Sequence, residues 1–348
     1  MTVAIAIVFL PLSPSYDLDV FLRAGQAVLH SLQVYPSPGS PAVYSGSSFV
    51  YPYFTVFPFV ALAAIGPSLA PMLFFALCVG AVLYATCTGS HADPWRASLI
   101  LGTTFMITGL QLGALSPLLF AGSILLWRLR ERPLALALIA GPLVASKLFL
   151  APLLIWLPLA CRYRALAWAG AATLLLLVAS FALGPIGPTP YAHLLSQLGR
   201  HEARAGFGPI GALMNLGVSP AAAQASAVLL ALAVLGAAYL YHRRTPAEGV
   251  LFGAAITASL VMTPVLWSHY LVLLPAVLLA LDARRRWFVV LAAASWAIAL
   301  PHNVRLDTDL IEGVSSSGTW VVVVISLAGL GYGARLTRGL RPPRGTPP

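Results

Sequence analysis

The residues best placed for chemistry begin with two aspartates in the stretch SYDLDVFLRAGQAVLHSLQVYP, residues 15–36. Asp19 lies four residues before Arg23, so on a helix the two can form an ion pair that contributes a few tenths of a kcal/mol. Asp17 has no such partner. Its carboxylate can cap the helix start by accepting hydrogen bonds from backbone N–H groups. Alternatively, a carboxylate at a water–lipid boundary can accept a proton from a substrate hydroxyl. Both interpretations stay open.

Basic side chains within or between apolar runs are the second group of candidates. Lys147 is the only lysine of the chain and interrupts an apolar run in VASKLFLAP. A cation at that depth is costly, so it either extends to the membrane boundary or pairs with an anionic group. His269 follows Trp267, where histidine is often a hydrogen-bonded boundary residue. Arg200, His201, Glu202 and Arg204 fit a solvated helix face, and the alternative is that Arg200 or Arg204 clamps a phosphate.

Metal and nucleotide chemistry lack a matching pattern in the sequence. Asp307, Asp309 and Glu312 lie close together, but in a short loop we expect them to be solvated turn residues. The sequence has no phosphate-binding glycine loop and no nucleotide-binding fingerprint. We therefore expect neither a metal nor another cofactor.

The composition indicates what must position these side chains. Of the 348 residues, 59% are hydrophobic and 9% are charged. A water-soluble domain of this size needs more surface charge, so most of the outside must face lipid. The net charge of +10 is divided among short clusters between apolar runs, as in cytoplasmic loops. We expect membrane lipids, and no nucleic acid, as partners of these clusters. They are Arg128, Arg130 and Arg132; Arg162 and Arg164; Arg243 and Arg244; Arg284, Arg285 and Arg286; and Arg335, Arg338, Arg341 and Arg344.

The apolar runs predict an all-α polytopic membrane protein with about eleven transmembrane helices. We expect one membrane domain over residues 1–335 and a disordered, basic cytoplasmic tail over 336–348. The runs lie at about residues 2–12, 50–66, 69–88, 97–113, 115–128, 134–146, 148–160, 166–184, 221–241, 249–265, 267–281, 287–301 and 318–335.

The side opposite the arginine clusters should receive most other ionisable residues. It would hold the loops 13–49 and 185–219 and the turns near Gln111, Lys147 and His269. Polar chemistry is therefore expected on the extracytoplasmic face. Between Tyr51 and Pro71, four prolines favour a broken or re-entrant pair of helices.

The stretch 15–36 has the spacing of an amphipathic helix in the first extracytoplasmic loop. Its apolar residues recur every three or four positions, and polar residues recur at the same spacing on another face. Such a helix is expected to lie on the outer membrane surface. The apolar stripe consists of Leu18, Phe21, Leu22, Gly25, Leu29 and Leu32.

Four segments, in this order, resemble a known family. They are DLDVFLRAGQAVLHSLQVYP with FVYPYFTVFPFVALA, then GLQLGALSPLLFAGSILLW, SKLFLAPLLIWLP and TPVLWSHYLVLLPA. Together they cover roughly residues 15–285 and resemble the polyprenyl-phosphate-mannose-dependent α-1,2-mannosyltransferases, glycosyltransferase family 87 of the GT-C superfamily. The resemblance implies a GT-C-type multispanning helical bundle in a bacterial plasma membrane.

The resemblance also implies a reaction and roles for residues. A mannosyl or related residue would pass, with inversion, from a polyprenyl-phosphate-linked donor to an extracytoplasmic glycolipid or glycan acceptor. Asp17 matches the family's catalytic aspartate and would be the general base, with Asp19 as the alternative. Lys147 would pair with the donor phosphate. Further substrate-binding candidates are His269, Tyr51, Gln111, Arg200 and Arg204.

Two other functions use similar residues. Intramembrane Asp, Lys and His also mark substrate pathways in transporters and in flippases for lipid-linked sugars. A transporter is expected to show matched halves or ionisable residues at mid-membrane depth, whereas here these residues gather at one face and no duplication is visible. A non-catalytic subunit that positions lipid intermediates is a third interpretation.

Overall fold

The computed structural model describes residues 16–45, 48–87 and 93–303. Within these ranges the chain forms helices joined by short turns, without a β-strand, which confirms the predicted all-helical class. Several predictions concern residues outside these ranges. They are the apolar runs at 2–12 and 318–335, the tail at 336–348, and Asp307, Asp309 and Glu312.

In the part of the chain that the structure describes, three helices are long and apolar enough to cross a bilayer: α4 (Leu69–Cys87), α10 (Tyr163–Leu183) and α13 (Pro220–Arg244). In each, only a third or less of the most apolar 18-residue segment is buried inside the fold. The remaining apolar side chains need lipid around them. The structure therefore supports a helical membrane protein, and the number of eleven spans stays a prediction.

The other apolar helices are shorter than a bilayer is thick. Proline stands in the first two positions of most of them, because it fits the helix start and terminates the preceding element. An apolar run can also divide without a proline. The run 97–113, for example, breaks at Gly102 and Thr103. These helices are α3 (Phe57–Ala64), α5 (Pro94–Leu101), α6 (Thr104–Leu112), α7 (Ser116–Arg128), α8 (Pro133–Ser146), α9 (Pro152–Leu159), α12 (Pro209–Asn215), α14 (Glu248–Met262) and α15 (Leu274–Ala280). The helix α16 (Arg285–Asn303) has 19 residues, as α4 does, but it begins with two arginines and is less apolar.

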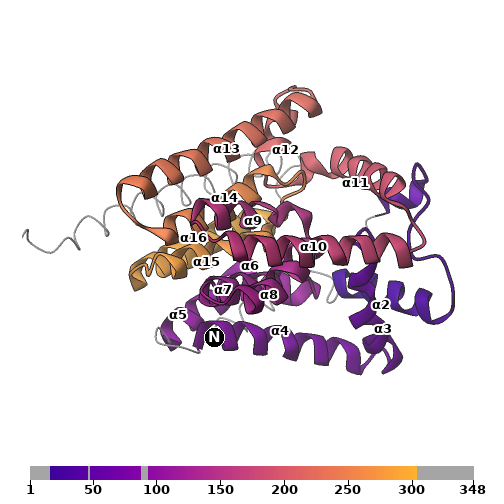
Figure 1. The fold of residues 1–348 in the computed structure, drawn as a ribbon. Coiled ribbons are helices and arrows are strands. Elements are labelled where there is room, and N and C mark those ends of the chain that lie inside the picture. Colours follow the sequence, from indigo (N-terminus) through magenta and orange to yellow (C-terminus); the bar gives the residue numbers. More distant parts are fainter. Residues whose placement is uncertain (1–15, 46–47, 88–92, 304–348) are drawn as a thin grey trace, which may run out of the picture.

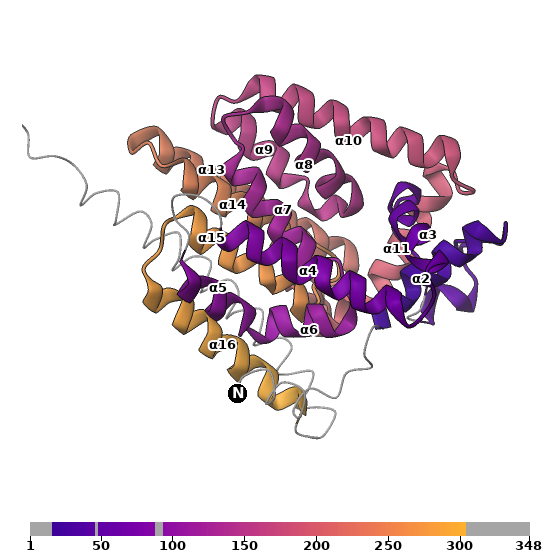
Figure 2. The ribbon, with the colours of Figure 1, turned by 90° about the horizontal axis from the view of Figure 1, so that it is seen from below.

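The long helices connect two chemically different ends of the bundle. At one end lie α2 (Tyr16–Leu29), α3 and α11 (Pro188–Glu202), which Figures 1 and 2 show close together. We call this the site end. The other end, the arginine end, carries the turns that precede α8, α10, α14 and α16. With 21 residues, α10 runs about 30 Å from the arginine end to the start of α11.

The helix α2 confirms part of the amphipathic prediction and corrects the rest. Leu18, Phe21 and Gly25 are buried as expected, but this face of α2 packs inside the fold, against α3 and the loop before α3, rather than lying on a membrane surface. Gly25 permits this approach, since a Cβ there would lie 2.5 Å from the carbonyl oxygen of Phe59. The helix ends at Leu29, and Leu32 is exposed.

Candidate functional site

Lys147 lies at the site end, in the break between α8 and α9. Its backbone is extended, which ends α8 at Ser146 before the short 3₁₀ helix η3 (Leu148–Leu150) begins. The ammonium donates a hydrogen bond of 2.6 Å to the hydroxyl of Tyr270 and lies 4.0 Å from the ring centroid of Tyr51. Within the described residues it has no ion pair. Since an ammonium has three N–H donors, two can serve an anionic ligand.

Asp17 lies in the first turn of α2 and is close enough to Lys147 for their charges to interact. Burial raises the pKa of Asp17 to about 6, although the positive charge of Lys147 acts in the opposite direction. The two groups form no direct ion pair in the described chain. A carboxylate with this pKa is ionised at neutral pH and basic enough to accept a proton from a reacting hydroxyl.

The neighbouring aspartate faces away. Asp19 is exposed and, in the part of the chain that the structure describes, forms no ion pair with Arg23. The sequence left Asp17 and Asp19 as alternatives for the base. Of the two, only Asp17 is next to the single lysine. The pairing of Asp19 with Arg23 along the helix is not present.

Aromatic side chains surround the ammonium of Lys147. The ring of Tyr51 contacts Phe21 of α2 at 4.6 Å between centroids, and its carbonyl oxygen accepts a hydrogen bond of 2.7 Å from the hydroxyl of Tyr35. Tyr270 lies in the 3₁₀ helix η5 (Ser268–Leu273), which packs against α6 and α7. Tyr270 was not among the residues expected from the sequence, although it follows His269 directly.

His269 is buried beside this group, with its ring 4.4 Å from that of Tyr270. Its Nε2 atom is buried and has no hydrogen-bond partner in the described part of the protein. Buried polar atoms are nearly always satisfied, so this nitrogen is suited to a hydrogen bond with a ligand. Lys147 lies near enough to act on it electrostatically.

Glu202, the last residue of α11, is half-buried and close enough to Lys147 and Asp17 for their charges to interact. Burial raises the pKa of its carboxyl, the charges of His201 and Lys147 lower it, and that of Asp17 raises it further. The charged run from Arg200 to Arg204 predicted a solvated helix face that included Glu202. The available signal was the spacing of Tyr191, Leu194 and Leu198, which continues to position 202 on the same side of a helix.

Arg200 and Arg204 lie outside this group, contrary to a role as a phosphate clamp. Both are exposed, and in the described chain their side chains make no hydrogen bond or ion pair. The solvated-face interpretation of these arginines fits the structure. We define the polar cluster as Asp17, Tyr51, Lys147, Glu202, His269 and Tyr270.

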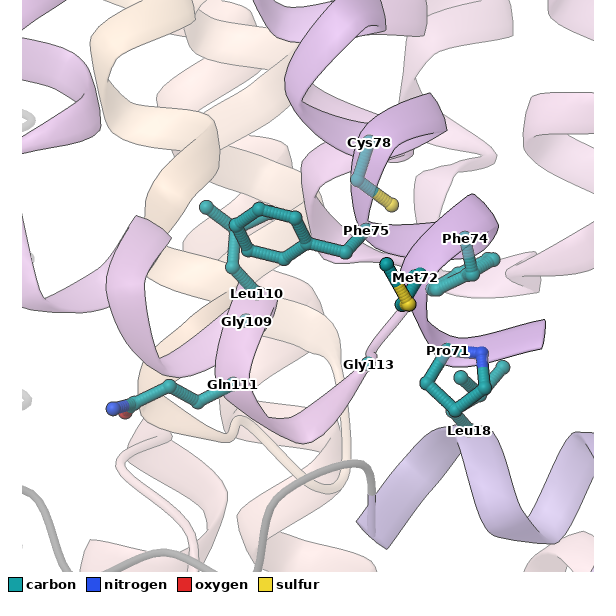
Figure 3. Close-up of a pocket in the computed structure, with 10 residues that line it drawn as sticks. All are labelled: Leu18, Pro71, Met72, Phe74, Phe75, Cys78, Gly109, Leu110, Gln111 and Gly113. Atoms are coloured by element: carbon teal, nitrogen blue, oxygen red, sulfur yellow. The ribbon is translucent and has the colours of Figure 1, made fainter. Parts of the chain in front are cut away.

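An apolar groove lies at the start of α2, where Leu18, the residue after Asp17, belongs to its lining. It has a volume of about 420 Å³ and lies between α4, the end of α6 and the start of α2 (Figure 3). Gly113, at a φ of 64°, lets the α6–α7 turn approach α2, since a Cβ there would lie 2.5 Å from Cβ of Leu18. The lining residues are Leu18, Pro71, Met72, Phe74, Phe75, Cys78, Gly109, Leu110, Gln111 and Gly113.

Gln111 stands at the edge of this groove. Figure 3 shows its amide group directed away from the other labelled side chains. The Oε1 atom is buried without a hydrogen-bond partner among the described residues, so it too can accept a hydrogen bond from a ligand. The groove side that belongs to α4 includes exposed Met72 and Phe75, on a helix that can cross the membrane.

The arrangement combines three chemical capacities at one place. Asp17 can take a proton, Lys147 can stabilise an anion, and the groove can accommodate a hydrocarbon chain. In the described residues no group of three or more His, Cys, Asp or Glu is positioned to hold a metal ion. Comparisons of the chain with protein-family models, characterised proteins and solved structures find no match. The family resemblance therefore rests on the four sequence segments alone.

Proposed function

We propose that this chain is an integral-membrane glycosyltransferase that uses a polyprenyl-phosphate-linked sugar as donor. The observation that carries the proposal is that Asp17 lies close enough to Lys147, the only lysine, for their charges to interact, although the two are far apart in the sequence. Glycosyl transfer from a lipid phosphate needs a base for the acceptor and a cation for the leaving group. The polar cluster contains both.

The reaction can be written with these two residues. The acceptor oxygen attacks the anomeric carbon, the bond from that carbon to the phosphate oxygen breaks, and the electron pair leaves with the phosphate. The hydroxyl proton passes to Asp17 late, as the glycosidic bond breaks and positive charge develops on the sugar. Lys147 stabilises the additional negative charge on the departing phosphate. A single displacement of this kind inverts the anomeric configuration.

The apolar groove favours a lipid-linked donor. It starts at Leu18, next to the base, and extends along the membrane-facing side of α4. A polyprenyl chain can occupy it while its phosphate stays at Lys147. In this account the site end is extracytoplasmic, because the arginine end has the charge pattern of cytoplasmic loops.

The finer features of the proposal follow from the sequence resemblance. They are a GT-C-type bundle of about eleven membrane helices in a bacterial plasma membrane, a mannosyl or related sugar, and a glycolipid or glycan acceptor. The donor is already activated by its phosphate link, so the reaction as written uses no metal or other cofactor.

The proposal is tested by sugar transfer in membranes that contain the wild type, Asp17→Asn or Asp19→Asn. Each preparation receives radiolabelled polyprenyl-phosphate mannose, or the corresponding glucose or galactose donor, and total lipid from the host. We expect labelled glycolipid with the wild type and Asp19→Asn, and a loss of about 10³-fold or more with Asp17→Asn.

Intact protein is verified by size-exclusion chromatography in detergent. If the folded wild type transfers sugar from none of the donors, the enzyme proposal is wrong, and translocation of the labelled lipid across vesicles becomes the next measurement. If Asp17→Asn stays active, the enzyme can stand but its base is misassigned.

A further inference from the structure

We propose that a second pocket, on the other side of α2 from the apolar groove, binds the carbohydrate part of the sugar acceptor. This inference rests on the proposed glycosyltransferase function and adds the binding site of the acceptor to it. Its basis is the lining of this pocket, the face of α2 that the pocket shares with Asp17, and the aromatic contacts that connect the pocket with Lys147.

The second pocket lies between α2 and the loop that follows this helix. It has a volume of about 350 Å³, within the range of small-molecule sites. Its wall is apolar and includes Ala24 of α2 and the buried rings of Tyr35 and Phe49. Polar side chains complete the lining. We call it the loop pocket.

The polar side chains of the loop pocket can both donate and accept hydrogen bonds. Arg23 and Gln33 are exposed, and within the described residues their side chains make no hydrogen bond or ion pair. Ser45 and Ser48 donate to the carbonyl oxygen of Ala42, at 2.8 and 2.5 Å, so their own oxygen atoms can accept. Sugar hydroxyls also donate and accept, and the C–H groups of a sugar ring can pack on the apolar wall. A lipid tail would match the wall alone.

The face of α2 that lines the loop pocket leads to the proposed base. Val20, Ala24 and Ala27 follow Asp17 by three, seven and ten positions, so all four share one side of the helix. Leu18, which lines the apolar groove, is about 200° from Val20 around the helix, and Asp17 lies between them, about 60° from Val20. Groove and pocket therefore lie on opposite sides of α2, with the base between their two faces.

Aromatic contacts connect the loop pocket with the polar cluster. The ring of Phe49 lies 5.7 Å from that of Tyr51, whose ring is 4.0 Å from the ammonium of Lys147. Phe21 contacts both rings, at 6.0 and 4.6 Å between centroids, and so holds them in place. An acceptor in the loop pocket can present a hydroxyl to Asp17, while a donor in the groove approaches from the other side of α2. Such an approach from two sides suits a displacement with inversion.

The test measures how the transfer rate depends on each substrate in two variants of the loop pocket. Ala27→Phe places a ring in the pocket, since Ala27 is half-buried in its wall, and Arg23→Gln removes the charge at its edge. Total lipid from the host is varied at a saturating concentration of the polyprenyl-phosphate sugar, which is then varied at saturating host lipid. In both variants the half-saturating amount of host lipid should rise about 10-fold or more, and that of the donor should stay within about twofold.

Gln26→Phe and Arg164→Gln are the matched controls. Gln26 is exposed on α2 outside the loop pocket, and Arg164 is exposed at the start of α10. Both controls should keep the wild-type dependence on host lipid.

Two results would overturn the inference. One is a wild-type dependence on host lipid in both pocket variants. The other is an equal rise in the half-saturating amounts of host lipid and donor, which would indicate that the substitutions only loosen α2. Because Arg23 is exposed, Arg23→Gln decides between these results if Ala27→Phe does not fold. Absence of transfer by the wild type would refute the proposed function, and the inference with it.

Discussion

Arg162 at one end of the bundle is held by two carboxylates, whereas Lys147 at the other end has a tyrosine hydroxyl as its hydrogen-bond partner. The Arg162 guanidinium donates hydrogen bonds to Glu248 at 2.8 Å and to Glu131 at 2.9 Å, and so connects three interhelical turns. Lys147, Asp17 and Glu202 influence one another without a direct ion pair in the described residues. The difference separates charges that are satisfied by the fold from charges that remain available to a ligand.

Of the two cations compared, the unpaired Lys147 has the larger predicted effect on transfer. Lys147→Gln should lower kcat/KM for the lipid-linked donor about 10²- to 10³-fold, because it removes the charge that stabilises the leaving phosphate. Lys147→Arg keeps the charge and should recover part of the loss. The measurement is initial transfer rate against donor concentration. Wild-type rates in Lys147→Gln would show that this lysine only marks the membrane boundary.

The pH dependence of transfer tests whether Asp17 is the base. Burial raises the pKa of Asp17 to about 6, and the base must be ionised to accept a proton. kcat/KM should therefore fall about tenfold per pH unit below this pH. In kcat the midpoint should lie higher, since the bound donor phosphate adds negative charge near Asp17. A flat profile between pH 5 and 8 would contradict the assignment of the base.

At the arginine end the expected effect is on stability. Arg162→Gln leaves Glu131 and Glu248 without their main partner and should lower the free energy of unfolding by about 2 kcal/mol, a value between those for exposed and buried pairs. Transfer per folded molecule should stay within about twofold of the wild type, since Arg162 is remote from the polar cluster. Thermal unfolding in detergent and the transfer assay measure the two quantities. An unchanged Tm combined with lost transfer would show that Arg162 serves the reaction and not the fold, which would contradict the comparison.

The smallest predicted effect concerns a hydroxyl. Tyr270→Phe removes the acceptor of the Lys147 hydrogen bond and keeps the ring, so the ammonium is less well positioned. We expect kcat/KM to fall about 3- to 10-fold. Tyr239→Phe is the control, because the Tyr239 hydroxyl accepts a hydrogen bond from Arg243 at the arginine end. Equal losses in both variants would indicate a general effect of removing a hydroxyl.

The sequence was sufficient for the class of fold and for the separation of charge between two ends. Composition alone predicts helices in lipid, and the clustered arginines predict the arginine end. The interruption of an apolar run by Lys147 correctly predicted a break between helices there. The turns near Gln111 and His269 also come to the site end as expected. The helices α5 and α6 together lead from Pro94 to the first turn, and α14 leads from Glu248 to the second.

Other features depend on packing that no local pattern encodes. The apolar stripe of α2 predicted a helix, but its burial depends on α3 and on the absence of a side chain at Gly25. The choice between Asp17 and Asp19 required knowing which side of α2 faces the bundle. Glu202 was missed because a run of charged residues was interpreted as a solvated face before the stripe through Tyr191 was extended to position 202.

The central claim, that unpaired charges serve catalysis and paired charges serve the fold, is tested most directly by one crossed measurement. Asp17→Asn and Glu248→Gln each replace one carboxylate by an amide, at opposite ends of the bundle. For both variants, transfer per folded molecule and Tm are measured side by side at pH 8. We predict that Asp17→Asn loses transfer and keeps or raises Tm, because an ionised, partly buried carboxylate is removed, while Glu248→Gln keeps transfer and loses Tm. A lowered Tm with normal transfer in Asp17→Asn would contradict the account.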